Sequence, residues 1–279
     1  MSPVSFPNLN VVWELPDNWC EWDHLEQTLL HADRFLTGLG LADRFIFVVM
    51  SVGDRLPISH AERVVVLQTS DEGHEIPAYA GDAFMVFKNY RPFDPMPDNL
   101  RVIPLGCNKD VPVVAAKPMA ARTLDMFFIG RQEFREPFFT AMNAWLDGRD
   151  DLMVEIEQAP AFREGLAPDV YAARLVNTKI ALSPRGVSHE TFRTYEAMRA
   201  GCAVIAERQL PSWFTDGWPV IEVDDWIEAG PLIEGLLAEP ARLEALGQAC
   251  QAWWLEKCSE EAVAHYIVRE LSLRLMGKG

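Results

Sequence analysis

Cysteine is scarce in this sequence, and the few cysteines are scattered. They form no C-x-x-C pair, and they are Cys20, Cys107, Cys202, Cys250 and Cys258. An odd and dispersed set argues against a disulfide framework and against a zinc knuckle, and it favours a reduced interior. Because burial is the commonest fate of a free cysteine, we do not expect a catalytic thiol.

Long apolar runs are also absent. No segment approaches the roughly 18 apolar residues of a membrane-spanning helix. The N-terminus, Met1-Ser2-Pro3-Val4, lacks the basic stretch and apolar run of a secretory signal. These absences and the cysteine pattern together predict a cytoplasmic protein.

Positive charge is the third shortage. The 25 Lys and Arg residues face 41 Asp and Glu residues, which gives a formal net charge of −16. Such a surface repels nucleic acid and anionic lipid, so we expect neither as a partner. A substrate that carries phosphate would need a locally positive pocket in this negative field. Any stretch where arginine converges with glycine and serine is therefore informative.

Metal-ligand patterns are missing as well. No two Asp residues lie two positions apart, and no cluster of His, Cys and carboxylates has the spacing of metal ligands. His24 and His31 are two helical turns apart, but no third ligand accompanies them. We therefore expect no metal site and no obligate metal.

The composition that remains is that of a globular protein. Hydrophobic residues make up 49% of the chain and charged residues 24%, which argues against disorder. A length of 279 residues is enough for two domains at about 100–200 residues each.

Short apolar runs alternate with helix-period segments along the whole chain. Two series of runs predict buried strands: Asn10–Leu15, Arg44–Ser51, Arg63–Gln68, Ala83–Lys88 and Arg101–Leu105, then Leu124–Ile129, Leu152–Ile156, Lys179–Leu182, Ala203–Ala206 and Val220–Val223. Helical periodicity is clearest in Asp23–Thr37, Phe134–Leu146, Val170–Val176, Thr191–Ala200, Ala241–Lys257 and Glu260–Leu275. Apolar strands separated by helices indicate parallel sheets covered on both faces. Two such series predict an α/β protein of two Rossmann-like domains.

The boundary between the two series is expected in Val111–Ala121, where Pro and Ala interrupt both periodicities. We predict a first domain over 1–116, a second over 117–258 and a C-terminal segment over 259–279. The helix in that last segment either finishes the second domain or crosses back to the first, and the sequence is compatible with both.

The densest signal for chemistry is Ile180–Glu207. A strand ends at Leu182, a Ser-Pro-Arg-Gly loop follows, and a helix begins near Thr191 and ends at Gly201. In an open α/β sheet, ligands bind beyond the carboxyl ends of the strands, where such loops meet helix N-termini. The N–H groups of the first helical turn and the helix dipole favour a phosphate there.

Small and hydroxylic side chains make this loop suitable for a phosphate. Gly186 lets the backbone approach closely, and the hydroxyl groups of Ser183, Ser188 and Thr191 can donate hydrogen bonds. His189 opens the helix and is a further candidate for phosphate contact.

Charged side chains in the same segment complete the pattern. Arg185 and Arg193 can neutralise two phosphates by charge-assisted hydrogen bonds. Glu196 lies beyond the first turn, where its oxygens can accept from sugar hydroxyls. Arg131 and Arg135 follow another strand end and are candidates to join them. An amphipathic helix with solvated Arg and Glu is the alternative interpretation.

These residues also resemble a known family. Leu182–Arg185, followed by T-F-R-T-Y-E-A-M-R-A-G-C from Thr191, is similar to the C-terminal signature of the exostosin-like glycosyltransferases. The resemblance is specific over Lys179–Trp226, which includes a later Leu-Pro element and an acidic-Trp segment. It is weaker over Arg101–Gly106 and Met126–Arg131.

The resemblance implies the GT-B architecture, in which two Rossmann-like domains face each other across a cleft. It implies a nucleotide-sugar donor in the second domain, most commonly UDP-linked, with Ser183 and Arg185 along the donor loop, Arg193 at the diphosphate and Glu196 at the ribose. It also implies a glycan or lipid-linked saccharide acceptor in cell-surface polysaccharide biosynthesis, and it is compatible with peripheral association with membrane-bound machinery. Eukaryotic exostosins carry a membrane anchor that this chain lacks, which points to a bacterial cytoplasmic member.

Two missing patterns refine the expected reaction. Metal-dependent sugar transferases use a D-x-D pair, so its absence predicts a metal-independent enzyme without cofactor. Retaining GT-B enzymes often carry two Glu residues eight positions apart around the ribose. Eight positions from Glu196 stand Val204 and Ser188, so we expect inversion.

An inverting transfer needs a general base at the acceptor. Asp71, Glu72 and His74 follow a predicted strand of the first domain and are the candidates, with a plain solvated turn as the alternative. At the end of the next strand, Lys88, Tyr90 and Arg91 are candidates for holding the acceptor.

Tryptophans and alternative functions complete the expectations. Core or interdomain packing is favoured for Trp213, Trp218 and Trp226 over stacking on the nucleotide or acceptor. Trp13, Trp19 and Trp22 form an acceptor platform or bury the first helix. A different GT-B-like enzyme, such as an epimerase or phosphorylase, lacks a convincing set of residues. A non-catalytic nucleotide-sugar-binding or scaffold protein remains the main alternative, and the sequence is silent on oligomeric state.

Overall fold

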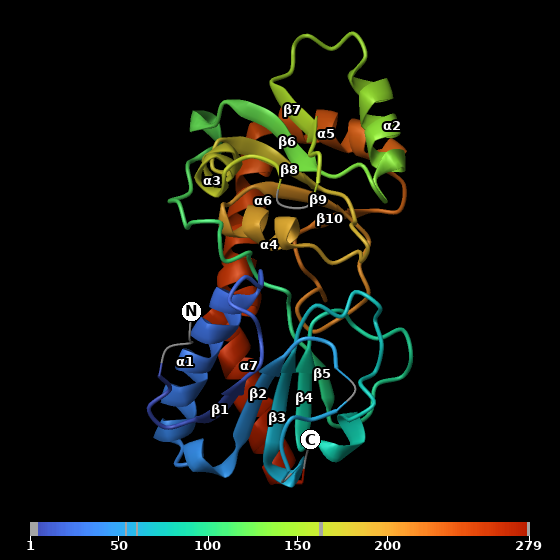
Figure 1. Ribbon diagram of the computed structural model, residues 1–279. Helices are drawn as coiled ribbons and strands as arrows, with labels where there is room; N and C mark the ends of the chain where they lie inside the picture. The colour runs from blue at the N-terminus through green and yellow to red at the C-terminus, as the bar shows by residue number, and fades with distance from the viewer. Residues whose placement is uncertain (1–4, 54, 60, 162–163, 278–279) are drawn as a thin grey trace. The chain divides into compact units, whose positions relative to one another are not determined.

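The computed structural model describes residues 5–53, 55–59, 61–161 and 164–277 (Figure 1). The N-terminal residues 1–4, on which the expectation of no secretory signal partly rests, lie outside these ranges. The chain forms two compact units. The first combines Met1–Lys109 with Lys257–Gly279, and the second is Asp110–Glu256.

The first unit is built on a parallel sheet whose strands follow one another in chain order, β1-β2-β3-β4-β5. The strands are β1 (Asn10–Trp13), β2 (Ile46–Met50), β3 (Val64–Gln68), β4 (Met85–Lys88) and β5 (Leu100–Val102). β3 and β4 are buried along their whole length, which agrees with their sequences, apolar except for the final Gln68 and Lys88. Short 3-10 helices connect the elements at Ala42–Arg44, Ala61–Arg63 and Ala80–Asp82.

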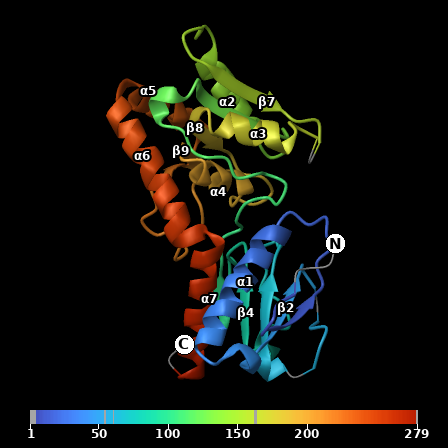
Figure 2. The same cartoon turned by 90° about the vertical axis from the view of Figure 1, so that its left-hand side faces the viewer.

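Two helices from opposite ends of the chain pack together in this unit. α1 (Trp22–Gly38) and α7 (Glu260–Leu275) lie side by side (Figure 2). The rings of Phe35 and His265 stack with centroids 3.9 Å apart. Arg101 on β5 holds α7 through an ion pair with Glu270, whose N···O distance is 2.7 Å. The C-terminal helix, whose place the sequence left open, thus packs in the first unit.

The second unit contains a parallel sheet in the order β10-β9-β8-β6-β7. Its strands are β6 (Leu124–Gly130), β7 (Val154–Gln158), β8 (Thr178–Ser183), β9 (Ala203–Glu207) and β10 (Ile221–Val223). Its helices are α2 (Glu136–Leu146), α3 (Pro168–Leu175), α4 (Phe192–Arg199), α5 (Ala229–Ala238) and α6 (Pro240–Trp253), with 3-10 turns at Met119–Ala121 and Trp226–Glu228. The chain places β7 on one side of β6 and β8 on the other, so the direction of winding reverses between β6 and β8.

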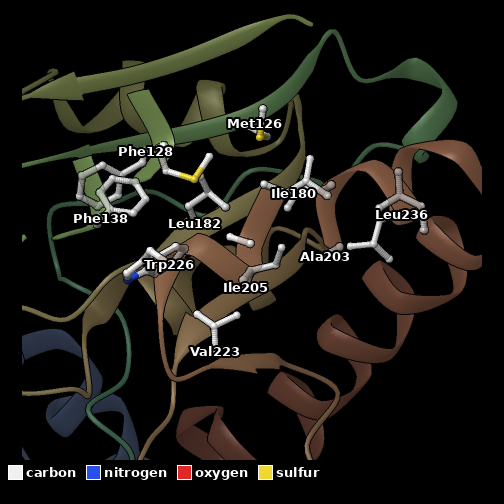
Figure 3. Close-up of a cluster of buried hydrophobic side chains, with 14 of the residues drawn as sticks. Met126, Phe128, Phe138, Ile180, Leu182, Ala203, Ile205, Val223, Trp226 and Leu236 are labelled. Carbon is white, nitrogen blue, oxygen red and sulfur yellow. The ribbon is translucent and has the colours of Figure 1, made fainter. Parts of the chain in front are cut away.

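The core of this unit is aromatic at its centre (Figure 3). Phe138 of α2 packs edge-on against Phe128 of β6 and against Trp226, with ring centroids 4.7 Å apart in both pairs. Edge-to-face pairs of this kind add about 0.5–1.5 kcal/mol each beyond their buried area. Trp226 is 3% exposed, so it serves the core, as the sequence favoured.

The expected elements and the observed ones agree closely. All ten predicted strands occur, with their ends within three residues of the expected positions. The predicted helix Ala241–Lys257 is in fact α6 followed by a π-helical turn at Trp254–Cys258, and α5 was not predicted. Within the described ranges, no helix has the length and apolarity to cross a membrane.

Candidate functional site

The reversal in the second sheet brings two loops together. Ligands of open α/β sheets bind outside the carboxyl ends of the strands at such a switch point. Here the switch point lies between β6 and β8, so the loop at 131–135 and the loop at 184–191 stand at the same place. These are the two loops in which the sequence concentrates arginine and glycine.

The loop after β8 is held by its own hydrogen bonds. Gly186 N–H donates to the Ser188 carbonyl at 2.9 Å, and Ser188 Oγ accepts from Glu190 N–H at 3.3 Å. Ser183 Oγ lies 3.0 Å from Thr191 Oγ1 and 2.8 Å from Thr194 Oγ1. These contacts tie the end of β8 to the start of α4.

The loop hydroxyls for which the sequence predicts phosphate contact are buried in this structure, and that contact stays a prediction. Ser183 is 1% exposed, Ser188 is 0% exposed and Thr191 is 7% exposed. Their hydroxyl groups bond within the loop because the strand end and the helix start pack tightly there. They shape the loop, which leaves contact with a ligand to its backbone and to its arginines.

The start of α4 retains the features of an anion site. Thr191 occupies the N-cap position with an extended backbone, but its side chain makes no capping hydrogen bond. The reason is that its hydroxyl is engaged with Ser183. N–H groups of the first turn that lack a side-chain cap, together with the helix dipole, favour a bound anion.

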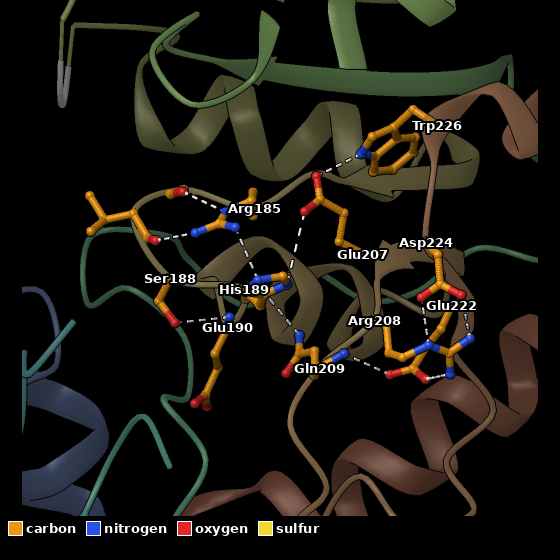
Figure 4. Close-up of polar contacts among 12 residues, drawn as sticks. Arg185, Ser188, His189, Glu190, Glu207, Arg208, Gln209, Glu222, Asp224 and Trp226 are labelled. Carbon is orange, nitrogen blue, oxygen red and sulfur yellow. Dashed lines mark hydrogen bonds and ion pairs between the residues drawn. The ribbon is translucent and has the colours of Figure 1, made fainter. Parts of the chain in front are cut away.

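Arg185 folds back over its own loop (Figure 4). Its guanidinium donates to the Val187 carbonyl at 2.8 Å and lies 3.1 Å from Nε2 of His189. His189 precedes α4 instead of opening it, and its Nδ1 is 3.9 Å from a carboxylate oxygen of Glu207. Both residues remain partly exposed at the loop surface.

Arg193 reaches from α4 across the switch point to β6. Its Nε donates to the Ile129 carbonyl at 2.8 Å, and its guanidinium carbon lies 5.4 Å from the centre of the Phe128 ring. Within the described residues its terminal nitrogens Nη1 and Nη2 make no hydrogen bond or ion pair. A partly buried guanidinium is thus oriented by its Nε while its terminal donors remain available.

Arg135 lies beside Arg193 and comes from the other loop. It is 6% exposed, donates from Nη1 to the Arg131 carbonyl at 3.1 Å, and lies 5.7 Å from the centre of the same Phe128 ring. One aromatic ring therefore supports two guanidinium groups by cation–π contact. Arg131, in contrast, pairs with exposed Glu133 at 2.9 Å.

Two glycines leave the space that these guanidinium groups occupy. A Cβ on Gly130 would lie 3.2 Å from Arg193 Nη2, and a Cβ on Gly186 would lie 3.2 Å from Arg135 Nη2. Both distances are shorter than ordinary van der Waals contact. The sequence identified Gly186 for close backbone approach, and the structure adds this reason for its lack of a side chain.

Glu196 has a partner that the sequence did not suggest. Its Oε2 accepts from the hydroxyl of Tyr171 on α3 at 2.9 Å, and Glu196 is 4% exposed. Burial, aided by the negative charge of Glu196, raises the pKa of Tyr171 well above its ordinary value. The phenol therefore stays protonated and acts as a donor. The two residues lie 25 positions apart, so only the fold brings them together.

In the first unit, Asp71 is engaged by a buried cation. Lys88 Nζ donates to Asp71 Oδ2 at 2.6 Å, and the same oxygen accepts from Glu75 N–H at 3.1 Å. Lys88 is 0% exposed and Asp71 is 5% exposed. The pair ties the loop after β3 to the end of β4, and the roles of Asp71 as a base and of Lys88 as an acceptor contact stay predictions.

The other candidate bases differ in exposure. Glu72 is exposed, whereas His74 is 9% exposed. Nδ1 of His74 lies 2.7 Å from the Arg91 carbonyl, and its ring stacks on Phe93 with centroids 4.4 Å apart.

Backbone strain is found after three of the strands. Four residues other than glycine have positive φ among those described, and all follow β3, β4 or β6: Ser70, His74, Tyr90 and Phe134. Strain of this kind, about 1–3 kcal/mol each, concentrates at functional sites.

Comparison with known proteins finds a family similar to most of the second unit and to the start of the C-terminal segment. Residues 131–269 match the family described as glycosyl transferase-like. The match covers just under half of the chain and includes both loops of the switch point. None of the curated proteins matches the sequence.

Solved structures extend the likeness to both units. An α-glucosyltransferase in complex with UDP and a 13-mer DNA has a TM-score of 0.54 at 10% identity, over 87% of this chain and 84% of that one. For a TarM variant of S. aureus in complex with fondaparinux, α-GlcNAc-glycerol and UDP, the TM-score is 0.53 and the sequence identity is 12%. The match covers 88% of this chain and 58% of that one. For AviGT4, a glycosyltransferase involved in avilamycin A biosynthesis, the TM-score is 0.49 and the sequence identity is 15%. The match covers 96% of this chain and 98% of that one. The chain has the two parallel-sheet, Rossmann-like halves of GT-B glycosyltransferases, and at these identities the likeness concerns the fold.

Possible metal ligands and cysteines were compared across the described parts of the chain. There, no group of three or more His, Cys, Asp or Glu side chains is arranged to hold a metal ion. The five cysteines are all free and buried. Burial raises the pKa of Cys202 to about 11 and that of Cys250 to about 12, so both thiols stay protonated at neutral pH.

Substituting Gly130 tests the geometry around Arg193. Gly130→Ala places a Cβ 3.2 Å from Arg193 Nη2 and 2.7 Å from Phe128 Cζ, so the guanidinium must shift. We expect UDP affinity measured by calorimetry to fall about 10-fold, which is about 1.4 kcal/mol. Gly235→Ala is the control, because nothing lies within 4 Å of the added carbon. Equal UDP affinity of both variants would show that Gly130 does not set the position of Arg193.

Proposed function

We propose that this protein is a glycosyltransferase whose nucleotide-sugar donor binds at the switch point of the second unit. The observation that carries the proposal is Arg193, oriented by its Nε across the switch point with its terminal nitrogens uncommitted within the described residues. Arg135 and the start of α4 add two further sources of positive potential at the same place. In a protein of net charge −16, this concentration favours a diphosphate.

The donor is proposed to be UDP-linked, and Glu196 is proposed to accept from its ribose. Glu196 lies on α4 three residues after Arg193, on the same helix face, and Tyr171 fixes one of its oxygens. The α-glucosyltransferase and the TarM variant are both described as complexes with UDP. The resemblance to the exostosin-like family supports the same nucleotide.

The reaction is proposed to transfer the sugar with inversion, without metal, to a glycan or lipid-linked saccharide in the cytoplasm. The bond from the anomeric carbon to the diphosphate breaks, and a bond to an acceptor hydroxyl forms. Negative charge develops on the departing diphosphate, where Arg193, Arg135 and the start of α4 stabilise it. The proton of the acceptor hydroxyl must leave for a base.

Turnover separates this enzyme from a protein that only binds nucleotide sugars. The wild-type protein is incubated in excess EDTA with a series of UDP-, GDP- and CMP-sugars, in water and with methyl glycosides as acceptors, and nucleotide release is measured. We expect release from at least one UDP-sugar. Nucleotide binding without release from any sugar would favour the non-catalytic alternative, and release only after Mg²⁺ or Mn²⁺ is restored would contradict metal independence.

A further inference from the structure

An exposed aromatic ring stands in the loop that follows β4. Phe93 is 70% exposed, and it is the most exposed aromatic side chain in the described parts of the chain. Single apolar side chains are exposed on most protein surfaces, so exposure alone does not indicate a site. What distinguishes Phe93 is the support beneath its ring.

The ring of Phe93 rests on the imidazole of His74. The ring centroids are 4.4 Å apart and the planes differ by 25°. His74 is 9% exposed, its Nδ1–H donates to the Arg91 carbonyl at 2.7 Å, and its ring meets Tyr90 edge-on at 5.9 Å. One face of Phe93 is therefore covered by a fixed ring. Since the side chain is 70% exposed, its opposite face is open to solvent.

Buried Lys88 fixes the loop that carries His74. Its Nζ donates to Asp71 Oδ2 at 2.6 Å and to the Glu75 carbonyl at 2.8 Å. The N–H group of His74 donates to the Asp71 carbonyl at 3.1 Å. One ammonium group at the end of β4 thus holds the chain on both sides of His74, and β4 also leads into the loop of Phe93.

The backbone of both loops is restricted as well. His74 and Tyr90 have φ values of +59° and +54°, which persist only where the surroundings over-determine them. Pro92 and Pro95 flank Phe93 and fix φ near −65° at their own positions. The ring is therefore held in place before any ligand arrives, and such a surface loses little conformational freedom on binding.

The exposed charges near the stacked rings are mostly negative. Glu72, Glu75 and Asp94 are exposed and lie within two residues of the pair along the chain, and partly exposed Arg91 supplies one positive charge. Carboxylates accept hydrogen bonds from sugar hydroxyl groups, but they repel a sugar that carries a carboxylate or phosphate. A pyranose has an apolar face of C–H groups and a rim of hydroxyl groups. An open aromatic face with carboxylates nearby suits a neutral pyranose.

We propose that Phe93, supported by His74, binds a neutral pyranose of the sugar acceptor. The C–H face of the sugar packs on the open face of the Phe93 ring, and the exposed carboxylates accept from its hydroxyl groups. The binding surface lies within the first unit. Its role in holding the acceptor rests on the proposed function.

Substitutions of Phe93 separate the aromatic ring from its apolar volume. Phe93→Ala removes the side chain, Phe93→Leu keeps an apolar group without a ring, and Phe93→Tyr keeps the ring. Leu39→Ala is the control, because Leu39 is an apolar side chain of the same unit with 58% exposure. Thermal denaturation should show unchanged stability in all four variants, since both positions are exposed.

The readout is saturation-transfer NMR of the whole chain without nucleotide, with the methyl glycosides of glucose, galactose, mannose, N-acetylglucosamine and glucuronic acid as probes. We expect at least one neutral glycoside to bind, with the strongest saturation at the C–H protons of one ring face. Its affinity should fall about 10-fold in Phe93→Ala and Phe93→Leu, and persist in Phe93→Tyr and Leu39→Ala. The glucuronide should bind more weakly than the glucoside.

Other results would overturn the assignment. Binding of no neutral glycoside, or equal affinity in the wild type and Phe93→Ala, would remove Phe93 as a sugar platform. A glucuronide that binds more tightly than the glucoside would contradict the preference for a neutral sugar.

Calorimetry of UDP binding to the same proteins keeps the two proposals apart. UDP binding without glycoside binding would overturn the platform and leave the proposed function standing. Glycoside binding that is lost in Phe93→Ala, in a wild type that does not bind UDP, would support the platform as a sugar-binding surface and overturn the proposed function.

Discussion

Replacing Arg193 with alanine is expected to weaken UDP binding by about 10–150-fold. Hydrogen bonds to a charged group contribute about 1.5–3 kcal/mol, and Arg193 offers its terminal nitrogens at the switch point. Isothermal titration calorimetry of the wild type and the variant measures the loss. Thermal stability should change little, since the structural contacts that disappear are one hydrogen bond to the Ile129 carbonyl and the cation–π contact with Phe128.

Two other arginines provide controls for the Arg193→Ala measurement. Arg242 is exposed, pairs with Glu239 on α6 and should be replaceable by alanine without effect on UDP affinity. Arg131 stands next to the site but pairs with Glu133, so its loss should cost less than that of Arg193. If Arg131→Ala weakens binding more than Arg193→Ala does, the diphosphate lies along the outer side of the β6 loop and our assignment is wrong.

Asp71→Ala is expected to destabilise the first unit by about 3–5 kcal/mol. Lys88 is 0% exposed, and removal of the Asp71 carboxylate takes a negatively charged partner from a buried ammonium group that still donates to the Glu75 carbonyl. Chemical denaturation monitored by tryptophan fluorescence measures the change. The neighbouring, exposed Glu72 supplies the control, and Glu72→Ala should alter stability by less than about 0.5 kcal/mol.

A second substitution shows whether the loss comes from the buried charge. Replacing both members of the pair, Asp71→Leu with Lys88→Met, removes the buried ammonium group together with its carboxylate partner and should recover much of the stability. A catalytic base would behave differently, because Asp71→Ala would then abolish turnover and leave the denaturation curve in place. That result would support Asp71 as the base.

The sequence predicts the elements of this fold well because their signals are local. Apolar runs of four to seven residues, such as Val64–Gln68 and Leu124–Gly130, are buried on both faces and stand out against their flanks. Strand order is not a local property. The reversal between β6 and β8, which brings the arginine loops together, is visible only once the strands pair.

The same distinction between local and non-local features applies to the candidate site. Gly186, Arg185 and Arg193 could be identified from one segment, because a loop and a helix start lie within a few residues of each other. The direction of each hydroxyl could not, and Ser183 and Thr191 turn out to bond each other. Contacts between residues far apart in the sequence could not be predicted either.

Two contacts illustrate this limit of the sequence. Tyr171 meets Glu196 across 25 residues, and Glu21 meets Ser70 across 49. A buried carboxylate at the start of a helix has no periodic or motif signal of its own. Such a group becomes a candidate only when its partners and its exposure are known.

A crystal structure of the protein with UDP tests the central claim most directly, which is that the switch point of the second unit holds a nucleotide diphosphate. The account predicts the diphosphate within hydrogen-bond distance of the terminal nitrogens of Arg193 and of backbone N–H groups in the loop after β8, with the ribose at Glu196. UDP bound elsewhere, with Arg193 still directed only at the Ile129 carbonyl, would contradict it.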